Sequence, residues 1–485
     1  MATPGENLAS GRTSDSQVVR ASASSREVAA AKDEVEVDQA AQRARPDQPP
    51  AEGEGDSSED QEDTNLGRSR AERRGGGGGP TRSEDREDRD SGYENYKSEL
   101  LNNTLGLKDS PVSMFGWLQG SYTANPGMRG DGKSFGINPS PGTNEFVFQQ
   151  LYFVIEKALD PEKSDEYDVG FRLDNLFGTD WQYYHMTGLF DHAFNVNKFG
   201  WEPVQFYADL HLPWLTEGGI DVKAGRFFSL GGYESAMAPS RPLNSAGYLF
   251  GYAQPFTHLG VMTTTYLTDR INLYNGVING WDRWFNENYR WGYAGGISWE
   301  SKDSRTNVTM TTTIGPNQFP YFFKADYDLA PNGVPQPPFL ASRRNLSYNH
   351  DNAVFFSNIL IHEFTDKLTL VLENDDGFEK NIPSFGPGKS AADGLWYGFG
   401  MWWLYAFNEK WTGVFRADML RDMNGTRTGY NNTFYETTLG AIWKPKTWLW
   451  IRPEIRYDWT SGAPVYDNGT RQNQLTFGFD FIFLF

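Results

Sequence analysis

One segment of the chain matches the consensus of a phosphate-binding loop, G-x-x-x-x-G-K-[ST]. Gly127, Gly132, Lys133 and Ser134 occupy the four specified positions. A phosphate-binding loop needs a helix directly after it, because the amides at the start of that helix hold the phosphates. The sequence that follows, FGINPSPG, cannot begin a long helix, since Pro and Gly interrupt it. We therefore expect a glycine-rich loop here and no nucleotide site.

The side chains that most often bind metals or act as nucleophiles form no recognisable motif. The chain has six His and no Cys, and no two His stand at the H-x-x-x-H or H-E-x-x-H spacing of a zinc site. The G-x-S-x-G turn that carries the nucleophile of many hydrolases is also absent. We predict no metal, no cofactor and no enzymatic activity. Two acidic stretches, residues 373–377 and 467–469, could bind calcium, although acidic loops are more often simply solvated.

Charged residues alternate with apolar residues in several segments. Between Ile451 and Trp459 every second residue is apolar and the residues between them are charged, and Phe recurs at every second position from Phe477 to Phe485. A period of two is typical of a strand with one apolar and one polar face. The apolar face can point into the core of a soluble sandwich or outward from a membrane barrel.

The same periodicity predicts sixteen strands. They span residues 112–124, 144–157, 167–176, 203–211, 219–228, 257–267, 270–279, 290–300, 306–314, 353–362, 367–375, 395–407, 410–419, 434–444, 447–457 and 474–485. The connections between them alternate between long and short, as in an outer-membrane barrel with short periplasmic turns and long outer loops. No stretch reaches 18 apolar residues, so helical membrane spans are not expected. We predict an all-β, transmembrane, antiparallel up-and-down β-barrel of about sixteen strands, which closes so that no backbone edge meets lipid.

In such a barrel, the charged residues of the alternating segments face the lumen. They are Asp168, Arg172, Asp174, Asp221, Lys223, Arg416, Asp418, Arg452, Glu454, Arg456, Asp458 and Asp480. They either set the ion preference of a channel or form cross-strand pairs, and both roles remain open. Because the two signs are mixed, a weakly selective pore is favoured. Tryptophans near strand ends are expected to form the interfacial girdles: Trp402, Trp403, Trp411, Trp448, Trp450 and Trp459.

Two long loops have expected roles. Residues 229–256, between the fifth and sixth strands, are the expected constriction, with Tyr233, Glu234, Arg241, Asn244 and Tyr248 acting on solutes by charge and hydrogen bonding. The loop could equally cap the barrel from outside. Residues 315–352 are Pro-rich and suit a trimer contact or an outer lid.

The N-terminal part has a different composition from the rest. Residues 1–92 contain no Phe, Trp or Tyr, and residues 1–100 carry 23 acidic and 14 basic residues. Such a segment cannot bury enough apolar surface to fold, so residues 1–100 are predicted to be a disordered extension and residues 101–485 the barrel. Its first residues lack the apolar run of a signal peptide, which fits either a cytoplasmic protein or an export signal that is missing from this start.

From about residue 112 to its end, the chain resembles the OmpL-like β-barrel porin family of bacterial outer membranes. The matching residues are Gly116, Trp117, Asn125, Pro126, Gln150–Tyr152, Glu156, Lys157, Gly170–Asp174, Phe177–Asp180, Gly225–Phe227, Gly232–Glu234, Pro255, His258–Val261, Asn275, Gly276, Asn279–Asp282, Arg452–Glu454, Arg456–Asp458 and Phe485. The resemblance implies a channel in the bacterial outer membrane. It also implies that the terminal aromatics, Phe481, Phe483 and Phe485, are a signal for the barrel-insertion machinery.

Together these observations predict an outer-membrane porin through which small hydrophilic solutes or ions diffuse passively. Its expected partners are outer-membrane lipid, the insertion machinery, its solutes and further copies in a homotrimer. Nucleic acid is not expected, because the formal net charge is −19. Two alternatives stay open: a barrel whose long loops bind a partner or surface polymer, and a secreted β-rich carbohydrate-binding protein.

Overall fold

The computed structural model describes residues 97–128, 132–139, 142–160, 164–186, 189, 198–284, 291–316, 353–382 and 392–485. The chain divides into two compact units, residues 1–62 and 63–485, and all described residues belong to the second. Most of the predicted extension, up to residue 96, lies outside the described residues, as does the outer loop from residue 317 to residue 352.

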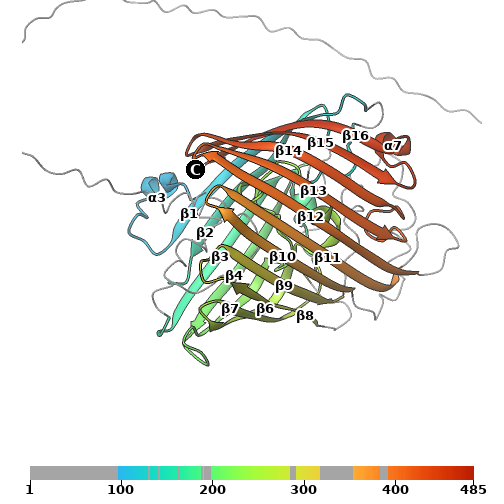
Figure 1. Cartoon of the computed structure of the whole chain (residues 1–485). Coiled ribbons are helices and arrows are strands. Elements are labelled where there is room, and N and C mark those ends of the chain that lie inside the picture. Colours follow the sequence, from blue (N-terminus) through green and yellow to red (C-terminus); the bar gives the residue numbers. More distant parts are fainter. Residues whose placement is uncertain are drawn as a thin grey trace, which may run out of the picture. The chain divides into compact units, whose positions relative to one another are not determined.

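Sixteen strands make up most of the described chain (Figure 1). They are β1 (Ser113–Ala124), β2 (Phe146–Lys157), β3 (Asp168–Gly178), β4 (Gly200–Leu212), β5 (Ile220–Phe228), β6 (Thr257–Thr268), β7 (Ile271–Ile278), β8 (Gly292–Glu300), β9 (Thr306–Gly315), β10 (Ala353–Thr365), β11 (Leu368–Ile382), β12 (Ala392–Asn408), β13 (Trp411–Met423), β14 (Thr433–Lys446), β15 (Leu449–Ser461) and β16 (Asn473–Leu484). The short helical segments are α3 (Glu99–Leu105), α4 (Trp181–Tyr184), η3 (Ala238–Ser240), η4 (Leu249–Ala253) and α7 (Tyr466–Gly469).

The strands form one closed barrel in which every strand pairs antiparallel with its neighbours in sequence. Closure comes from β1 and β16, which pair from Trp117 opposite Leu484 to Ala124 opposite Phe477. Because the last strand pairs with the first, the sheet has no open edge. The predicted fold class and the sixteen strands are therefore confirmed.

Each predicted strand overlaps one observed strand, although several strands are longer than predicted. The largest difference is in β11, which continues to Ile382 instead of ending at residue 375. The polar residues at the end of β11 stay in the sheet because they pair with aromatic residues of β12, for example Asp376 with Tyr397. Residues 373–377, considered above as a calcium loop, thus lie within a strand.

The apolar face of each strand points out of the barrel. In β16, Phe477 and Phe479 are 43% and 42% exposed, whereas the intervening Thr476 and Asp480 are 2% and 0% exposed. An outward apolar surface suits the hydrocarbon of a membrane. A soluble sandwich would turn these apolar faces inward, so the soluble secreted alternative does not fit this barrel.

Two of the tryptophans predicted for the interfacial girdles face inward instead. Trp402 and Trp450 are 1% and 3% exposed, whereas Trp411 and Trp448 are 39% and 48% exposed. Adjacent residues of a strand point to opposite faces, so Trp402 and its neighbour Trp403 cannot both face lipid. Trp403 is the outer one, and its ring stacks on Phe364 at 5.8 Å.

Helices contribute little to this fold. None in the described ranges combines the length and the apolar character that crossing a membrane requires. Two weaker apolar runs in the sequence, near residues 183–190 and 320–327, add no strand among the described residues, because the first falls partly on α4 and the second lies outside them. Described residues 132–139, which follow the phosphate-loop consensus, contain no helix.

Candidate functional site: the loop inside the barrel

The connection between β5 and β6, residues 229–256, crosses the lumen of the barrel. The side chain of Gln150 in β2 donates a hydrogen bond to the carbonyl oxygen of Ala236 at 3.0 Å. The indole of Trp396 in β12 donates one to the carbonyl oxygen of Ala253 at 2.9 Å. At least five strands separate β2 from β12 around the barrel, so the loop is attached to distant parts of the wall. We call residues 229–256 the inner loop.

Three arginines of the wall hold the main chain of the inner loop. Arg416 in β13 donates to the carbonyl oxygen of Ser245 at 2.5 Å, and Arg456 in β15 donates to that of Ala246 at 2.7 Å. Arg452, also in β15, donates to the carbonyl oxygen of Ala238 at 2.9 Å. All three guanidinium groups are fully buried. Each also pairs with a wall carboxylate, and these carboxylates belong to Glu436, Asp458 and Asp480.

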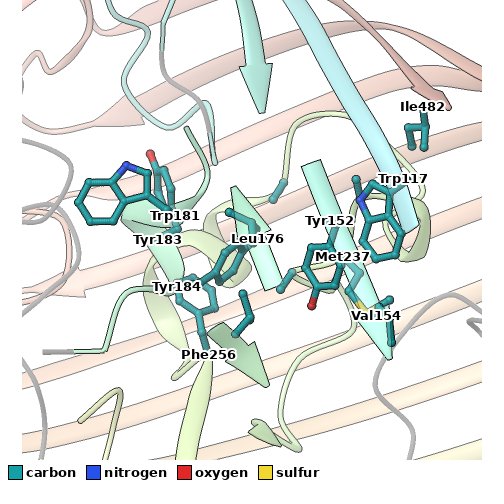
Figure 2. Packing of buried hydrophobic residues seen from close by; sticks show 14 of the residues in the cluster. Trp117, Tyr152, Val154, Leu176, Trp181, Tyr183, Tyr184, Met237, Phe256 and Ile482 are labelled. Atoms are coloured by element: carbon teal, nitrogen blue, oxygen red, sulfur yellow. The ribbon is translucent and has the colours of Figure 1, made fainter. Parts of the chain in front are cut away.

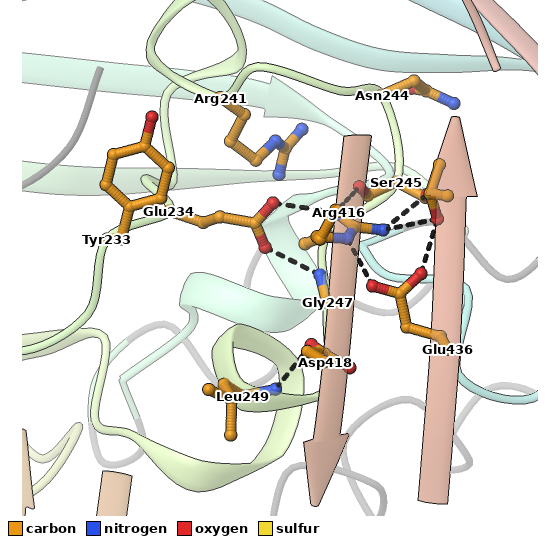
Figure 3. Close-up of polar contacts among 12 residues, drawn as sticks. Tyr233, Glu234, Arg241, Asn244, Ser245, Gly247, Leu249, Arg416, Asp418 and Glu436 are labelled. Carbon is orange, nitrogen blue, oxygen red and sulfur yellow. Dashed lines mark hydrogen bonds and ion pairs between the residues drawn. The ribbon is translucent and has the colours of Figure 1, made fainter. Parts of the chain in front are cut away.

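Carboxylates also hold the inner loop, because they accept hydrogen bonds from its main-chain amides. Glu234 of the loop accepts from Arg416 at 2.8 Å and from the amide of Gly247 at 2.7 Å, so it fastens the loop both to the wall and to itself (Figure 3). Glu454 of the wall accepts from the amide of Asn244 at 3.0 Å. Asp418 lies close to the amide of Leu249, at 3.4 Å. A charged acceptor or donor makes each of these bonds stronger than a neutral pair would be.

Apolar contacts also hold the inner loop. Met237 and Phe250 of the loop belong to a buried cluster with Trp117 of β1 and Tyr152 of β2, whose rings stack at 4.2 Å. Figure 2 shows Met237 beside Tyr152 on the inner wall. The loop therefore packs against this part of the wall as in the core of a soluble protein, and it is a fixed part of the barrel.

The residues predicted for the constriction all lie in the inner loop and are buried. The ring of Tyr233 packs on Trp402 at 5.0 Å, and the side-chain oxygen of Asn244 is 3.4 Å from the donating amide of Gln119. The ring of Tyr248 lies under the guanidinium of Arg456, at 5.3 Å. Its hydroxyl is hydrogen-bonded to that of Tyr466 at 2.9 Å.

Arg241 differs from the three wall arginines. It is 1% exposed, yet among the described residues its guanidinium nitrogens have no hydrogen-bond partner. Its charge acts on Asp180, which follows β3 and accepts a hydrogen bond from Gln150 at 2.8 Å. Burial raises the pKa of Asp180 to about 7, and the positive charge of Arg241 opposes that rise. Asp180 therefore changes charge near neutral pH beside the inner loop.

Eleven of the twelve charged residues predicted for the lumen lie on the inner face of the wall, and Asp168 lies at the rim. The carboxylate of Asp168 pairs there with Lys157 at 2.9 Å. Seven of the eleven hold the main chain of the inner loop directly or through a neighbour: Arg416, Asp418, Arg452, Glu454, Arg456, Asp458 and Asp480.

The remaining four inner-face residues pair with groups of the wall, and Arg172 also contacts the sulfur of Met237 in the inner loop at 3.8 Å. Arg172 pairs with Asp174 at 2.7 Å, and Asp221 lies 2.6 Å from the ring nitrogen of His211. The ammonium of Lys223 lies over the ring of Tyr207 at 4.1 Å.

Several residues that anchor the inner loop carry no motif in the sequence. Glu373 accepts from the amide of Tyr233 at 3.2 Å, and Arg427 donates to the carbonyl oxygen of Tyr252 at 2.6 Å. Glu373 begins the acidic stretch considered for calcium, and the signal for its position at the loop is its inward place in the alternation of β11. Arg427 lies in a loop, where alternation gives no information.

No group of three or more His, Cys, Asp or Glu in the described part of the chain is placed to hold a metal ion. The polar groups at the inner loop instead bind main-chain amides and carbonyls. This arrangement fixes the position of a segment within a channel and leaves charged groups next to it.

Comparison with known proteins agrees with this architecture. The family described as "Putative beta-barrel porin-2, OmpL-like" matches residues 111–485. No curated protein matches the chain. Similar solved structures include the outer membrane channel DcaP of Acinetobacter baumannii, with 7% identity, a TM-score of 0.50 and coverage of 77% of this chain and 97% of that one. Another is OprB of Pseudomonas putida, with 13% identity, a TM-score of 0.50 and coverage of 80% and 97%.

At these identities the solved structures support the fold alone, whereas the family match extends over most of the sequence. It confirms the family that the sequence resembles. The chain belongs to the OmpL-like β-barrel porins of the bacterial outer membrane.

Proposed function

We propose that the inner loop forms the constriction of this porin and that the charged groups around it set its ion preference. The protein is an outer-membrane porin, a passive channel for small hydrophilic solutes or ions. The observation that supports the proposal is the attachment of the loop to both β2 and β12 across the lumen. A segment fixed there narrows any path through the barrel.

We expect weak ion selectivity. The wall arginines are each paired with a carboxylate, so most charge at the inner loop is compensated locally. Diffusion through such a pore needs no catalytic group or cofactor, and we expect neither. We also propose that copies of the chain associate as a homotrimer.

We further propose that Phe481, Phe483 and Phe485 are the signal for the barrel-insertion machinery. Phe481 and Phe483 lie on the outer face of β16, where a second protein can reach them before the barrel closes. The main chain of Phe485 exchanges two hydrogen bonds with Gly116 of β1, both of 2.9 Å. Replacing Phe485 with Ala should lower the amount of folded barrel in the outer membrane without changing the conductance of the barrels that do insert.

The test of the channel is single-channel recording with the full chain in planar bilayers, with a salt gradient to measure the reversal potential. Stable conductance steps with a small reversal potential are expected. If the folded barrel gives no steps, the function moves to the outer loops, which would then bind a partner or a surface polymer.

A further inference from the structure

Polar side chains face outward from the middle of the barrel wall on one side of the molecule. They come from β6, β7, β9, β10 and β11, and they are Thr263, Asn275, Thr312, Asn358, Asn374 and Asp376. We call these six residues the polar outer face. Five of them are two residues along the strand from an exposed apolar side chain, for example Asn275 from Val277 (52% exposed) and Asn358 from Phe356 (48%), and Asp376 is two residues from Asn374. Successive residues alternate between the two faces of a strand, so both asparagines point away from the lumen.

These residues lie at the depth where a barrel normally meets hydrocarbon. Asn358 is the sixth of the 13 residues of β10, and Asn374 is the seventh of the 15 residues of β11. The two asparagines pair in register across these strands, and Asn275 pairs with Thr263 between β7 and β6. The polar residues are therefore adjacent on the surface and form no part of the two rims.

Contacts within the barrel satisfy only part of this face. Asn358 donates to the side-chain oxygen of Asn374 at 3.2 Å, and Tyr293 donates to the side-chain oxygen of Asn275 at 3.0 Å. Within the described ranges, the amide nitrogen of Asn275 and the side-chain oxygen of Asn358 have no hydrogen-bond partner, and Asp376 has no ion-pair partner. Polar groups without partners cost several kcal/mol each in hydrocarbon. Thr263, Thr312 and Asn374 donate to main-chain carbonyls, so the groups that lipid cannot satisfy are those of Asn275, Asn358 and Asp376.

The wall is lowest at β7 to β9, beside the taller strands β10 and β11 of this face. Strands β7, β8 and β9 have 8, 9 and 10 residues, whereas β11 and β12 have 15 and 17. A tilted strand needs about 9–11 residues to cross the hydrocarbon of a membrane, so β7 is too short. The opposite side, around β16, differs, because its outward residues Phe477 and Phe479 are 43% and 42% exposed. That side matches lipid both in length and in polarity.

We propose that the polar outer face is the surface through which copies of this chain associate in the membrane. Carboxamides both donate and accept hydrogen bonds, so a face built from asparagines and threonines complements a copy of itself. A second copy also carries its polar groups at the same depth and has the same low wall. The proposal identifies the contact of the homotrimer proposed above. It does not depend on whether the pore conducts.

The absence of native cysteine allows a direct test. Asn275→Cys, Asn358→Cys and the double variant are expressed as full chains, and outer membranes are treated with a short bis-maleimide. Cross-linked product should run at a whole multiple, two or three, of the 54.9 kDa of one chain on a denaturing gel. Phe477→Cys, on β16 at least six strands from β7 and β10 around the barrel, is the matched control and should stay monomeric. Conductance of the same preparations is recorded separately, so loss of association and loss of the channel are distinguishable.

A second measurement keeps the proposal falsifiable if cross-linking is inefficient. A fluorescent maleimide attached to the thiol of the Asn358→Cys variant should be protected from brominated lipids in vesicles, whereas the label on the Phe477→Cys variant should be quenched. Equal quenching at both positions would mean that lipid covers the polar outer face, and this would overturn the proposal. A cross-linked product whose mass is no multiple of one chain would assign the face to a different protein and would overturn it too.

Discussion

At the scale of single residues, the barrel interior is held by charges that are buried but compensated. Arg416 has no exposed surface and touches two carboxylates, Glu234 at 2.8 Å and Glu436 at 2.6 Å. Burying one unpaired charge costs far more free energy than burying a pair, so removal of either partner strongly destabilises the folded barrel. The same side chain also binds a loop carbonyl, which couples the stability of the wall to the position of the loop.

Replacing Arg416 with Met should therefore lower the free energy of unfolding by about 3–5 kcal/mol, because two carboxylates lose their cation. Urea unfolding in detergent micelles measures this change. Arg421→Met on the same strand is the control. Its guanidinium is at the surface, 2.7 Å from Asn431, and its loss should change stability by less than about 0.5 kcal/mol. Equal effects of the two variants would show that Arg416 does not anchor the loop.

Asp180 should make the selectivity of the channel depend on pH. Its pKa is raised to about 7 by burial, so it gains a negative charge as the pH rises through that value. The reversal potential should shift toward cation preference as the pH rises. Asp180→Asn should remove the shift, and an unchanged shift in this variant would exclude Asp180 as its source.

The same group affects stability in a defined direction. Below about pH 4, Asp180 is protonated in both the folded and the unfolded chain, so its ionisation does not lower the free energy of unfolding there. As the pH rises toward the folded pKa of about 7, only the unfolded chain ionises, and stability is lost. The Asp180→Asn variant should therefore lose less stability than the wild type over the same rise in pH.

At the scale of elements, the position of the inner loop depends on how it leaves the wall. Gly232 has a φ of +91°, and a Cβ atom there would lie 1.8 Å from the side-chain oxygen of Gln254. Its amide donates to the hydroxyl of Ser357 in β10 at 3.1 Å. The backbone can make this turn only because the residue has no side chain.

Gly232→Ala should displace the start of the inner loop and change the single-channel conductance. Part of the effect is the cost of a positive φ in a residue with a side chain, about 1–2 kcal/mol. Gly106→Ala isolates that cost, because Gly106 has a φ of +70° with no atom within 4 Å of the added carbon. A normal conductance in Gly232→Ala would show that this turn does not position the loop.

At the scale of the whole molecule, the barrel depends on the pairing of its first and last strands. Eight residue pairs join β1 to β16, and removal of residues 480–485 deletes five of them, from Leu484 to Asp480. The remaining contact would leave unpaired backbone groups of β1 and β15 in hydrocarbon, which is strongly unfavourable.

The truncated chain should therefore fail to form a heat-modifiable barrel on a gel. A chain without residues 1–90, which lie outside the described ranges, is the control and should fold normally. A stable barrel from the chain truncated at its C-terminus would mean that another pairing can close the sheet.

The sequence by itself determined the class of fold, the number of strands and which face of each strand is apolar. These features follow from local alternation, because successive side chains of a strand point to opposite faces whatever lies opposite them. Alternation also placed Arg416, Arg452 and Arg456 on the inner face. The prediction for Trp402 and Trp450 was wrong because it used their proximity to strand ends and not their place in the alternation of the strand.

Only the tertiary structure decided what the inner face contacts. That residues 229–256 turn inward depends on Gln150, Trp396 and the wall arginines, which lie on strands far apart in the sequence. The raised pKa of Asp180 has the same origin, since burial and the nearby Arg241 arise only when the loop packs against the wall. The polar outer face also needed the closed barrel, because the register of β6 to β11 brings its residues together at one depth. Local patterns fix the direction of a side chain, and only the folded chain fixes its neighbours.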